Sequence, residues 1–448
     1  MPSTDRTTIV SAPGKVLLAG GYLVLDPAFS GLVVATDARF YTLIRPGQHS
    51  TTTGPYKIVV RSPQFNNATW TYWITLQGAS IDFSPSKQDE SRNTFVELAL
   101  NYSFAMLARL VPAETLNKTL ESGLDIVIAG NNDFYSQRKE LQQDDITNTQ
   151  FLHNIAQFVH CLAQGKVGSG FDVSSAVWGS HTYRRFSPEV LQSVMHQDAI
   201  QDIPALLKVV TPKETAWDNV VVPFKLAPRL HLMLADIDAG SHTPTLVSNV
   251  LKWRKTKPEE ANGLWARLGG SNDRVVELLK DLDQVAKNHQ EAYDRSIHMA
   301  STVAASEWSG LVNQTITNED ATLELLVKIY DEFLTVRRYL REMSQLSEVP
   351  IEPEEQTRLL NACMTVPGVL MAGVPGAGGF DAIFCIVLSD ESRRGVEGVW
   401  AGFKEMSVGP LLCQESIEGG LVVELGHGHG DSKPLSEQTP TVQRLLQL

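Results

Sequence analysis

The sequence is poor in positive charge. Its 448 residues include 38 lysines and arginines against 51 aspartates and glutamates, which gives a formal net charge of −13. Nucleic acids and anionic membranes are bound through basic patches, so this balance argues against both as partners. A small anionic ligand is still compatible with it, because a local cluster of lysine and arginine can override the field of distant acids.

Cysteines and long apolar runs are also scarce. The cysteines are Cys161, Cys363, Cys385 and Cys413. They lie far apart among apolar neighbours, without the spacing of metal ligands, so we expect buried free thiols in a reducing compartment. No run is long enough to span a bilayer, and Gly14 and Lys15 break the N-terminal apolar stretch, which argues against a signal peptide. Without such signals, the expected location is cytoplasmic.

What is present is an ordinary globular composition, with 43% hydrophobic and 20% charged residues. Segments rich in β-branched and aromatic residues predict strands at 7–10, 31–44, 56–60, 70–76, 124–128, 230–235 and 421–425, and two more within 369–388. Apolar residues at helical spacing predict helices at 95–111, 149–163, 273–297, 319–343 and 393–406. This mixture predicts an α+β fold, with helices on one face of a mainly antiparallel sheet.

The length suits two domains. The chain changes character around residues 220–228, so we expect a first domain at 1–222 and a second at 223–425. The glycine- and histidine-rich stretch from Gly426 predicts a flexible tail, 426–448, with a metal site there as a weaker alternative.

The most informative segment runs from Gln164 to Ser180 and is followed by Tyr-Arg-Arg-Phe at 183–186. Glycines at 165, 168 and 170 allow the backbone to approach a ligand closely, and Asp172 opens a predicted helix. Two adjacent arginines can grip a phosphate or carboxylate. The segment therefore predicts a pocket for a small anionic molecule.

Two further segments are read together with it. Residues 11–25 read Ser-Ala-Pro-Gly-Lys-Val-Leu-Leu-Ala-Gly-Gly-Tyr-Leu-Val-Leu, and residues 373–381 read Gly-Val-Pro-Gly-Ala-Gly-Gly-Phe-Asp. The second is, by itself, most often a glycine hairpin between two strands. Histidines 153 and 160 lie on the predicted helix 149–163, but no acid or cysteine completes a metal set, so they are interpreted as packing or surface residues.

These three segments resemble motifs of the phosphomevalonate kinases, members of the GHMP superfamily named for galactokinase, homoserine kinase, mevalonate kinase and phosphomevalonate kinase. The resemblance runs from residue 8 to residue 425. It implies a two-domain GHMP-kinase fold, with a first domain like ribosomal protein S5 and a ferredoxin-like second domain. It also implies ATP- and Mg²⁺-dependent phosphorylation of 5-phosphomevalonate to 5-diphosphomevalonate, a step of the mevalonate pathway to isoprenoids and sterols.

The resemblance assigns catalytic roles to Lys15 and Asp172. Lys15 would stabilise charge on the transferred phosphoryl group, although a solvated lysine at a strand edge fits the sequence equally. Relatives that phosphorylate an alcohol use the aspartate as a base. A phosphate monoester has its second pKa at about 6 and is already mostly ionised at neutral pH, so Asp172 is expected instead to orient Lys15. A helix N-cap aspartate fits the same position.

The acceptor would be bound by other residues of the same motifs. Tyr22 would shape the pocket, with a core tyrosine as the alternative. One of Arg184 and Arg185 would reach the ligand, because neighbours in a strand point to opposite faces. The remaining candidates are Lys166, Ser169, Ser174, Ser175, Ser241 and Thr243, of which the last two fit a helix cap as well. The support loop of Pro375, Gly376, Gly378 and Gly379 completes the set.

One superfamily motif is missing, a glycine- and serine-rich loop whose backbone amides hold the phosphates of ATP. The superfamily's order puts it between residues 137 and 151, an interval that contains no glycine. Neither the ATP phosphate loop nor metal ligands can therefore be assigned. Three explanations are ranked in this order: a mispredicted or alternatively spliced gene product, a non-catalytic relative that still binds the acceptor, or another segment at the phosphate site.

The sequence leaves two other functions open. The chain could be another GHMP enzyme, such as a mevalonate kinase or a diphosphomevalonate decarboxylase, although the arginine pair disfavours mevalonate because mevalonate carries no phosphate. It could also be a catalytically dead binding protein that takes the acceptor without ATP. The oligomeric state cannot be inferred.

Overall fold

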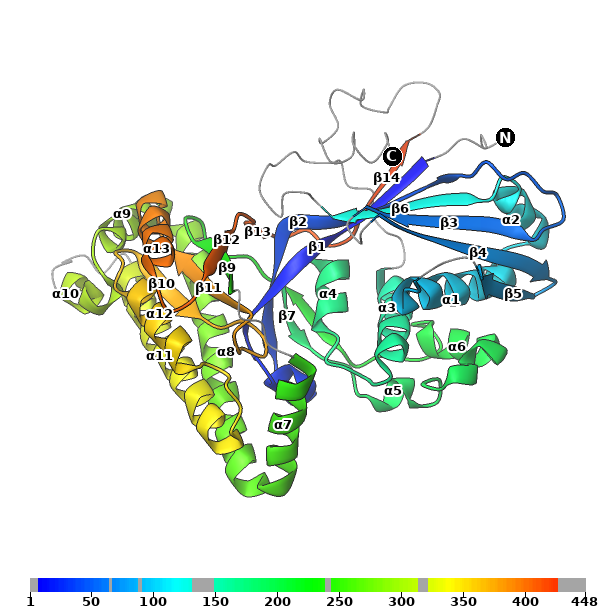
Figure 1. Ribbon diagram of the computed structural model, residues 1–448. Helices are drawn as coiled ribbons and strands as arrows, with labels where there is room; N and C mark the ends of the chain where they lie inside the picture. The colour runs from blue at the N-terminus through cyan, green and yellow to red at the C-terminus, as the bar shows by residue number, and fades with distance from the viewer. Residues whose placement is uncertain are drawn as a thin grey trace.

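The computed structural model describes residues 7–63, 67–87, 91–130, 149–237, 243–312 and 321–425. Within these ranges the chain forms two β-sheets with helices packed on them (Figure 1). The α+β architecture is as predicted. No helix in these ranges is both long and apolar enough to cross a membrane.

The first sheet has the strand order β14-β1-β2-β6-β3-β4-β5, with β7, β8 and β13 attached through β2. Its strands are β1 (Thr7–Ala19), β2 (Gly31–Pro46), β3 (Tyr56–Ser62), β4 (Ala68–Gln77), β5 (Ser80–Pro85), β6 (Leu124–Gly130), β7 (His181–Arg184), β8 (Val220–Pro223), β13 (Glu415–Ser416) and β14 (Leu421–Leu425). Only β3 and β6 pair in parallel among the described strands. The mainly antiparallel sheet is therefore as predicted.

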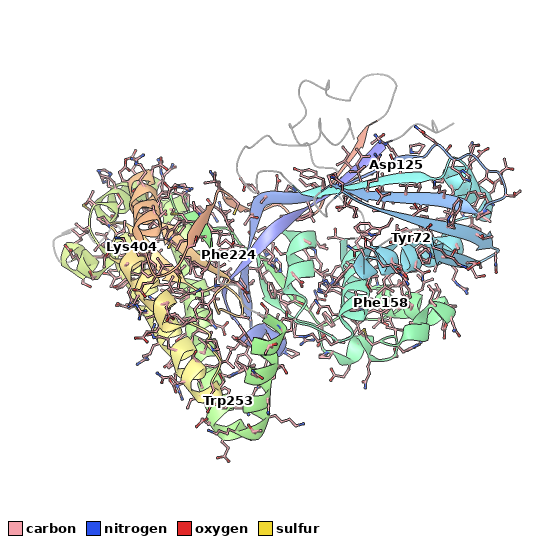
Figure 2. The ribbon with its side chains drawn as sticks, viewed as in Figure 1. Tyr72, Asp125, Phe158, Phe224, Trp253 and Lys404 are labelled. Atoms are coloured by element: carbon pink, nitrogen blue, oxygen red, sulfur yellow. The ribbon has the colours of Figure 1, made fainter. Side chains whose placement is uncertain are left out.

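Helices cover one face of this sheet. They are α1 (Thr94–Leu110), α2 (Ala113–Leu120), α3 (Thr149–Gln164), α4 (Phe171–Trp178), α5 (Glu189–Gln192) and α6 (Ile203–Val210). Asn93 caps α1 by accepting from two backbone amides of its first turn. Phe158 of α3 is buried and packs edge-on against Tyr102 of α1, with ring centroids 4.9 Å apart (Figure 2). Apolar burial thus fixes α3, the helix that precedes the glycine-rich segment.

The second sheet has the order β10-β11-β9-β12, formed by β10 (Val369–Gly373), β11 (Ala382–Val387), β9 (His231–Ile237) and β12 (Val408–Leu411). Its helices are α7 (Thr243–Thr256), α8 (Pro258–Asn288), α9 (Gln290–Ser301), α10 (Trp308–Val312), α11 (Thr322–Ser347), α12 (Glu354–Met364) and α13 (Asp390–Gly402). Helices lie on both faces, α8 and α11 on one and α12 and α13 on the other. The expectation of one covered face is wrong here, because β11 is apolar at nearly every position and buries both sides.

Short 3₁₀ helices complete the described elements: η1 (Leu23–Leu25), η2 (Gln197–Gln201) and η3 (Ala305–Glu307). The helix predicted at 273–297 is two helices, because α8 ends at Asn288 and α9 begins at Gln290. The predicted strand 421–425 is confirmed as β14, and it pairs with β1 in the first sheet. The domain boundary at residue 222 stays a prediction. After the second sheet is complete, the chain returns to the first sheet, where β13 pairs with β2 and β14 pairs with β1.

The two sheets are joined through α7. Near its C-terminal end, Arg254 forms an ion pair with Asp26, which directly follows η1, at 2.7 Å. The Arg254 guanidinium also lies 3.8 Å from the ring centroid of Trp265 on α8. This arginine ties the turn after β1 to the helices of the second sheet. The predicted tail 426–448 and residues 131–148, which cover most of the interval of the missing phosphate loop, lie outside the described residues.

Candidate active site

Lys15 lies on β1, at a break in the strand's pairing with β2. The register shifts between Pro13 and Lys15, and Lys15 is exposed while its neighbour Val16 is buried. Its ammonium nitrogen is 5.7 Å from the ring centroid of Phe171, the first residue of α4. The strand irregularity therefore presents this cation beside the start of the helix that carries Asp172.

A glycine-rich turn leads into α4. Gly165 and Gly170 have φ of 67° and 76°, which side chains rarely tolerate. A Cβ on Gly170 would lie 2.7 Å from the amide atoms of Gln157, whose Nε2 donates to the Gly170 carbonyl at 2.7 Å. Gly170 is the N-cap, so Asp172 lies in the first turn of α4 and is not the capping residue. A carboxylate there is favoured by the helix dipole.

Asp172 contacts His160, for which the sequence predicts a packing or surface role. One of its carboxylate oxygens lies 3.2 Å from Nε2 of His160 on α3. The side chain of Gln164, one turn later, contacts the same nitrogen at 2.7 Å, and Phe95 packs against the ring. The sequence does contain a signal for this contact, a His and a Gln spaced i, i+4 just before the glycine-rich turn. That α3 lies next to Asp172 of α4 is seen only in the fold.

Two other candidates of this segment face different surroundings. The carbonyl of Ser169 accepts a hydrogen bond from the Tyr183 hydroxyl at 3.0 Å, so β7 is bonded to the glycine-rich turn before α4. Lys166 is exposed, and its backbone amide donates to the Cys161 carbonyl at 3.1 Å. The ammonium of Lys166 is thus available to a ligand in solution.

The two adjacent arginines diverge, as the alternation of a strand predicts. Arg184, the last residue of β7, is exposed, whereas Arg185 is only 4% exposed. One guanidinium nitrogen of Arg185 donates to the Leu25 carbonyl at 2.7 Å. Its Nε and Nη2 have no hydrogen-bond partner among the described residues. Burial lowers the pKa of Arg185 from its ordinary value.

Tyr22 connects the first segment to the support loop. It is buried, has φ of 63°, and its hydroxyl donates to the Ala377 carbonyl at 2.7 Å. Burial raises the pKa of this hydroxyl, so it remains a donor. The Gly376 amide also donates to the Leu17 carbonyl at 3.2 Å. Two hydrogen bonds therefore seat the loop of the second sheet on the first segment.

The support loop approaches other backbones more closely than any side chain would allow. Gly376, Gly378 and Gly379 have φ of 64°, 66° and 86°. A Cβ on Gly378 would lie 2.0 Å from the Ile351 carbonyl, and the Gly379 amide donates to that carbonyl at 2.8 Å. Glycine is required here for the loop to fit.

Thr243 is the first residue of α7, and its hydroxyl lies 3.4 Å from a carboxylate oxygen of Asp381, which ends the third motif. Ser241 lies outside the described residues. In the described ranges, no group of three or more His, Cys, Asp or Glu side chains could hold a metal ion. The four cysteines are free and buried, as predicted.

A buried polar cluster packs against α4, whose Ser174 and Trp178 contact two buried histidines. Oγ of Ser174 lies 2.7 Å from Nε2 of His181, whose Nδ1 donates to the Gly179 carbonyl at 2.8 Å. His153 packs against Trp178, with ring centroids 4.3 Å apart. Burial lowers the pKa of both histidines to about 4, so each is neutral at physiological pH. The interpretation of His153 as a packing residue is confirmed.

The chain is similar in sequence to known proteins and to one family model. Residues 325–403 match the family model described as GHMP kinases C terminal. The chain is 35% identical to a peroxisomal phosphomevalonate kinase of Arabidopsis thaliana over 490 residues, covering 92% of this chain and 95% of that protein. It is 31% identical to a phosphomevalonate kinase of Aspergillus fumigatus, covering 86% and 88%. Since the first alignment is longer than this 448-residue chain, the Arabidopsis protein carries residues that the chain lacks.

Solved structures with the same fold are more distant in sequence. A protein of Listeria innocua superposes with a TM-score of 0.62 at 14% identity, covering 93% of this chain and 99% of that one. The phosphomevalonate kinase of Streptococcus pneumoniae, in complex with phosphomevalonate and AMPPNP, superposes with a TM-score of 0.55 at 12% identity, covering 91% and 99%. The fold is therefore that of the GHMP kinases, as the three sequence motifs implied.

Proposed function

This chain belongs to the phosphomevalonate kinase family, and on that premise we propose how its own residues perform the reaction. The chain is a phosphotransferase that transfers the terminal phosphoryl group of ATP to the phosphate of 5-phosphomevalonate, giving ADP and 5-diphosphomevalonate. The observation that carries the assignment of residues is that the first motif contacts both of the others. Lys15 lies against Phe171 at the start of α4, and Leu17 and Tyr22 are hydrogen-bonded to the support loop.

Arg185 is proposed to bind the phosphate of the acceptor. Its Nε and Nη2 are buried and unpaired among the described residues, and a buried donor without a partner is costly. A planar guanidinium with two adjacent free donors matches two oxygens of one phosphate. Arg184 is exposed on the other side of the strand, so we assign it to the surface.

Lys15 is proposed to stabilise the charge that develops on the migrating phosphoryl group. Asp172 lies in the first turn of the helix next to it and is held by His160. Because the attacking phosphate oxygen is already ionised, the reaction needs no base, and Asp172 sets the local charge and orientation around Lys15. In-line transfer then depends mainly on positioning and electrostatics.

The remaining acceptor contacts are proposed from the same motifs. Tyr22, in the short segment between β1 and η1, is proposed to shape the acceptor pocket, with Lys166, Ser169 and Thr243 as further polar contacts. Ser241 is proposed as another contact from its place in the sequence. Pro375, Gly376, Gly378 and Gly379 act through backbone position: their loop holds Tyr22 and closes the pocket from the second sheet.

ATP is the phosphoryl donor, and Mg²⁺ is proposed as its companion ion. Magnesium is commonly held by one or two carboxylates together with nucleotide phosphates, which agrees with a site that offers Asp172 and no larger cluster in the described ranges. Bound there, it would neutralise phosphate charge. The segment that binds the nucleotide phosphates remains unassigned.

A cytoplasmic location and the absence of nucleic-acid and membrane partners also remain proposals, based on charge and on the lack of targeting signals. The Arabidopsis relative is named as peroxisomal.

The test of these assignments is the rate of ADP release with 5-phosphomevalonate or mevalonate as acceptor. The native chain should use only the phosphorylated acceptor. Arg185→Met should weaken its affinity roughly ten- to a hundredfold, since a hydrogen bond to a charged group contributes about 1.5–3 kcal/mol. Lys15→Ala should abolish turnover, and Arg184→Met, the matched control, should change little. Equal effects of the two arginine variants would overturn the assignment.

A further inference from the structure

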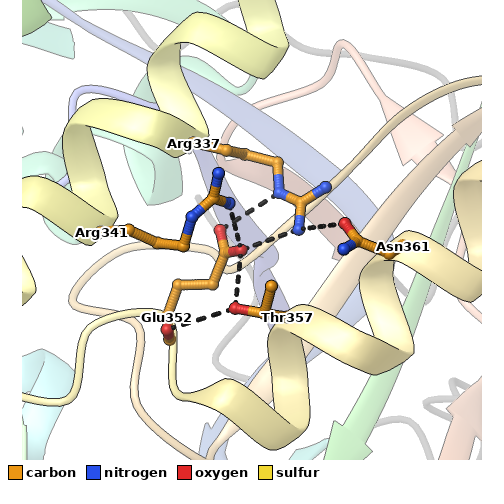
Figure 3. A network of polar contacts seen from close by, with 5 residues as sticks. All are labelled: Arg337, Arg341, Glu352, Thr357 and Asn361. Atoms are coloured by element: carbon orange, nitrogen blue, oxygen red, sulfur yellow. Dashed lines mark hydrogen bonds and ion pairs between the residues drawn. The ribbon is translucent and has the colours of Figure 1, made fainter.

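A charged network is buried behind the support loop. The Glu352 carboxylate is fully buried and accepts from Nη2 and Nε of Arg337 at 2.7 and 3.1 Å (Figure 3). It also accepts from Nη1 of Arg341 at 2.9 Å and from the Thr357 hydroxyl at 3.1 Å. Nη2 of Arg337 donates further to the side-chain oxygen of Asn361 at 3.1 Å. The network fastens α11 and α12 to the short connection between them.

Stability alone does not account for such a network. Removing two charges from water costs several kcal/mol per ion, and well-packed apolar side chains of similar volume are often as stabilising. A buried network does restrict the conformations of the backbone that carries it. The connection around Glu352 is therefore held in one position more firmly than apolar packing would hold it.

The residue next to Glu352 touches the support loop. The Ile351 carbonyl accepts from the Gly379 amide at 2.8 Å, and a Cβ on Gly378 would lie 2.0 Å from it. On the other side, the Ile351 amide donates to the Ser344 hydroxyl at 2.9 Å. Glu352 is thus directly bonded to the residue whose carbonyl meets Gly378 and Gly379.

The support loop in turn holds Tyr22, whose hydroxyl donates to the Ala377 carbonyl. A continuous set of contacts therefore runs from Glu352 through Ile351 and the loop to the first motif. We propose that Glu352, clamped by Arg337 and Arg341, is a positioning residue that sets the support loop on Tyr22 and thereby the affinity for the phosphorylated acceptor. The link to the acceptor rests on the proposed function, whereas the link to the loop does not.

The first test is amide hydrogen exchange of the peptide that covers residues 373–381, in the native chain and in Glu352→Gln. The substitution keeps the shape of the side chain and removes its charge, so exchange at Gly376 and Gly379 should accelerate about tenfold. Arg358→Ala, which breaks an exposed ion pair with Glu405 on the other side of α12, is the matched control and should leave exchange in the loop unchanged. Unchanged exchange in Glu352→Gln would overturn the proposal.

A double-mutant cycle tests the route to Tyr22, with the dissociation constant for 5-phosphomevalonate measured by calorimetry. Glu352→Gln and Tyr22→Phe should each weaken binding several-fold, and the double variant should bind no more weakly than the weaker-binding single variant. If the fold-changes in dissociation constant of the two single variants multiply in the double variant, Glu352 does not act through Tyr22, and the proposal is overturned. A native chain that binds no 5-phosphomevalonate would reject the proposed function and the acceptor link together, whereas the exchange experiment would still decide the link to the loop.

If Glu352→Gln does not fold, Arg341→Met replaces it in both experiments. The Arg341 side chain is 37% exposed, so its loss leaves the fully buried pair of Arg337 and Glu352 in place. It should accelerate exchange in the loop by a smaller factor, and no change at all would again overturn the proposal.

Discussion

At the scale of single residues, neighbours in sequence acquire different roles through burial. Alternation along β7 predicted that only one of Arg184 and Arg185 faces inward, and the burial of Arg185 agrees with it. The pairing of His160 with Asp172 could not be predicted in the same way. It joins residues of two helices, and their separation depends on the packing of α3 and α4.

His160 gives the first prediction. We expect His160→Gln to lower kcat on the order of tenfold with little change in acceptor affinity, because Asp172 loses the contact that holds its carboxylate in place. Steady-state kinetics would measure the two effects separately. His196→Gln, at an exposed histidine of the same region, is the control. An unaltered kcat in His160→Gln would show that the contact has no part in orienting Asp172.

The buried histidines predict how stability depends on pH. Burial lowers the pKa of His153 and of His181 to about 4, against 6.5 for an ordinary histidine. Between these values the unfolded chain binds more protons than the folded one, so stability is full above pH 6.5 and falls as the pH drops towards 4. At pH 5 the loss should be about 2 kcal/mol per histidine.

Denaturant unfolding followed by tryptophan fluorescence at pH 5 and pH 7.5 measures this difference, since Trp178 and Trp217 lie against His153. The double variant His153→Gln/His181→Gln should be less stable at pH 7.5 and much less sensitive to pH. The same pH dependence in that variant would assign the effect to other groups.

At the scale of elements, the support loop is defined by its close backbone contacts. Gly378→Ala should lower kcat/KM for 5-phosphomevalonate by tenfold or more, because its Cβ would meet the Ile351 carbonyl at 2.0 Å. Gly398→Ala on α13, where a Cβ meets nothing within 4 Å, is the matched control and should preserve activity. If both variants keep native kinetics, the observed position of the support loop is not required for turnover of 5-phosphomevalonate.

Much of the element order could be predicted from sequence. Strand patterns identified β2, β3, β4 and β6 to within a few residues, because these segments are rich in β-branched and aromatic residues. The break at His289 was missed, since both α8 and α9 continue the same apolar spacing across it. The return of β14 to the edge of β1 depends on the path of the whole chain and leaves no local signal.

At the scale of the whole molecule, the candidate site is assembled from both sheets. The ion pair of Asp26 with Arg254 and the hydrogen bond of Tyr22 to Ala377 both join them. The three motifs predicted this meeting through their resemblance, but the contacts that hold it, such as the Arg254 clamp, come from residues that no motif contains.

The missing phosphate loop gives a prediction at this scale. Replacing residues 131–148 with a glycine- and serine-rich loop of the superfamily type should strengthen ATP binding, because such a loop before a helix supplies backbone amides to phosphates. Affinity for 5-phosphomevalonate, which is bound by other segments, should not change and is the internal control. Calorimetry with each ligand measures both. Unaltered ATP affinity would mean that another segment of this chain already serves the nucleotide.

This chain phosphorylates a phosphate and not an alcohol, and phosphorus NMR of the purified chain with ATP, Mg²⁺ and 5-phosphomevalonate can follow that step. We predict that the monophosphate signal of the acceptor is replaced by the paired signals of a diphosphate as ADP accumulates, and that Lys15→Ala gives neither. A persistent monophosphate signal with a folded native chain would show that the chain does not phosphorylate this acceptor.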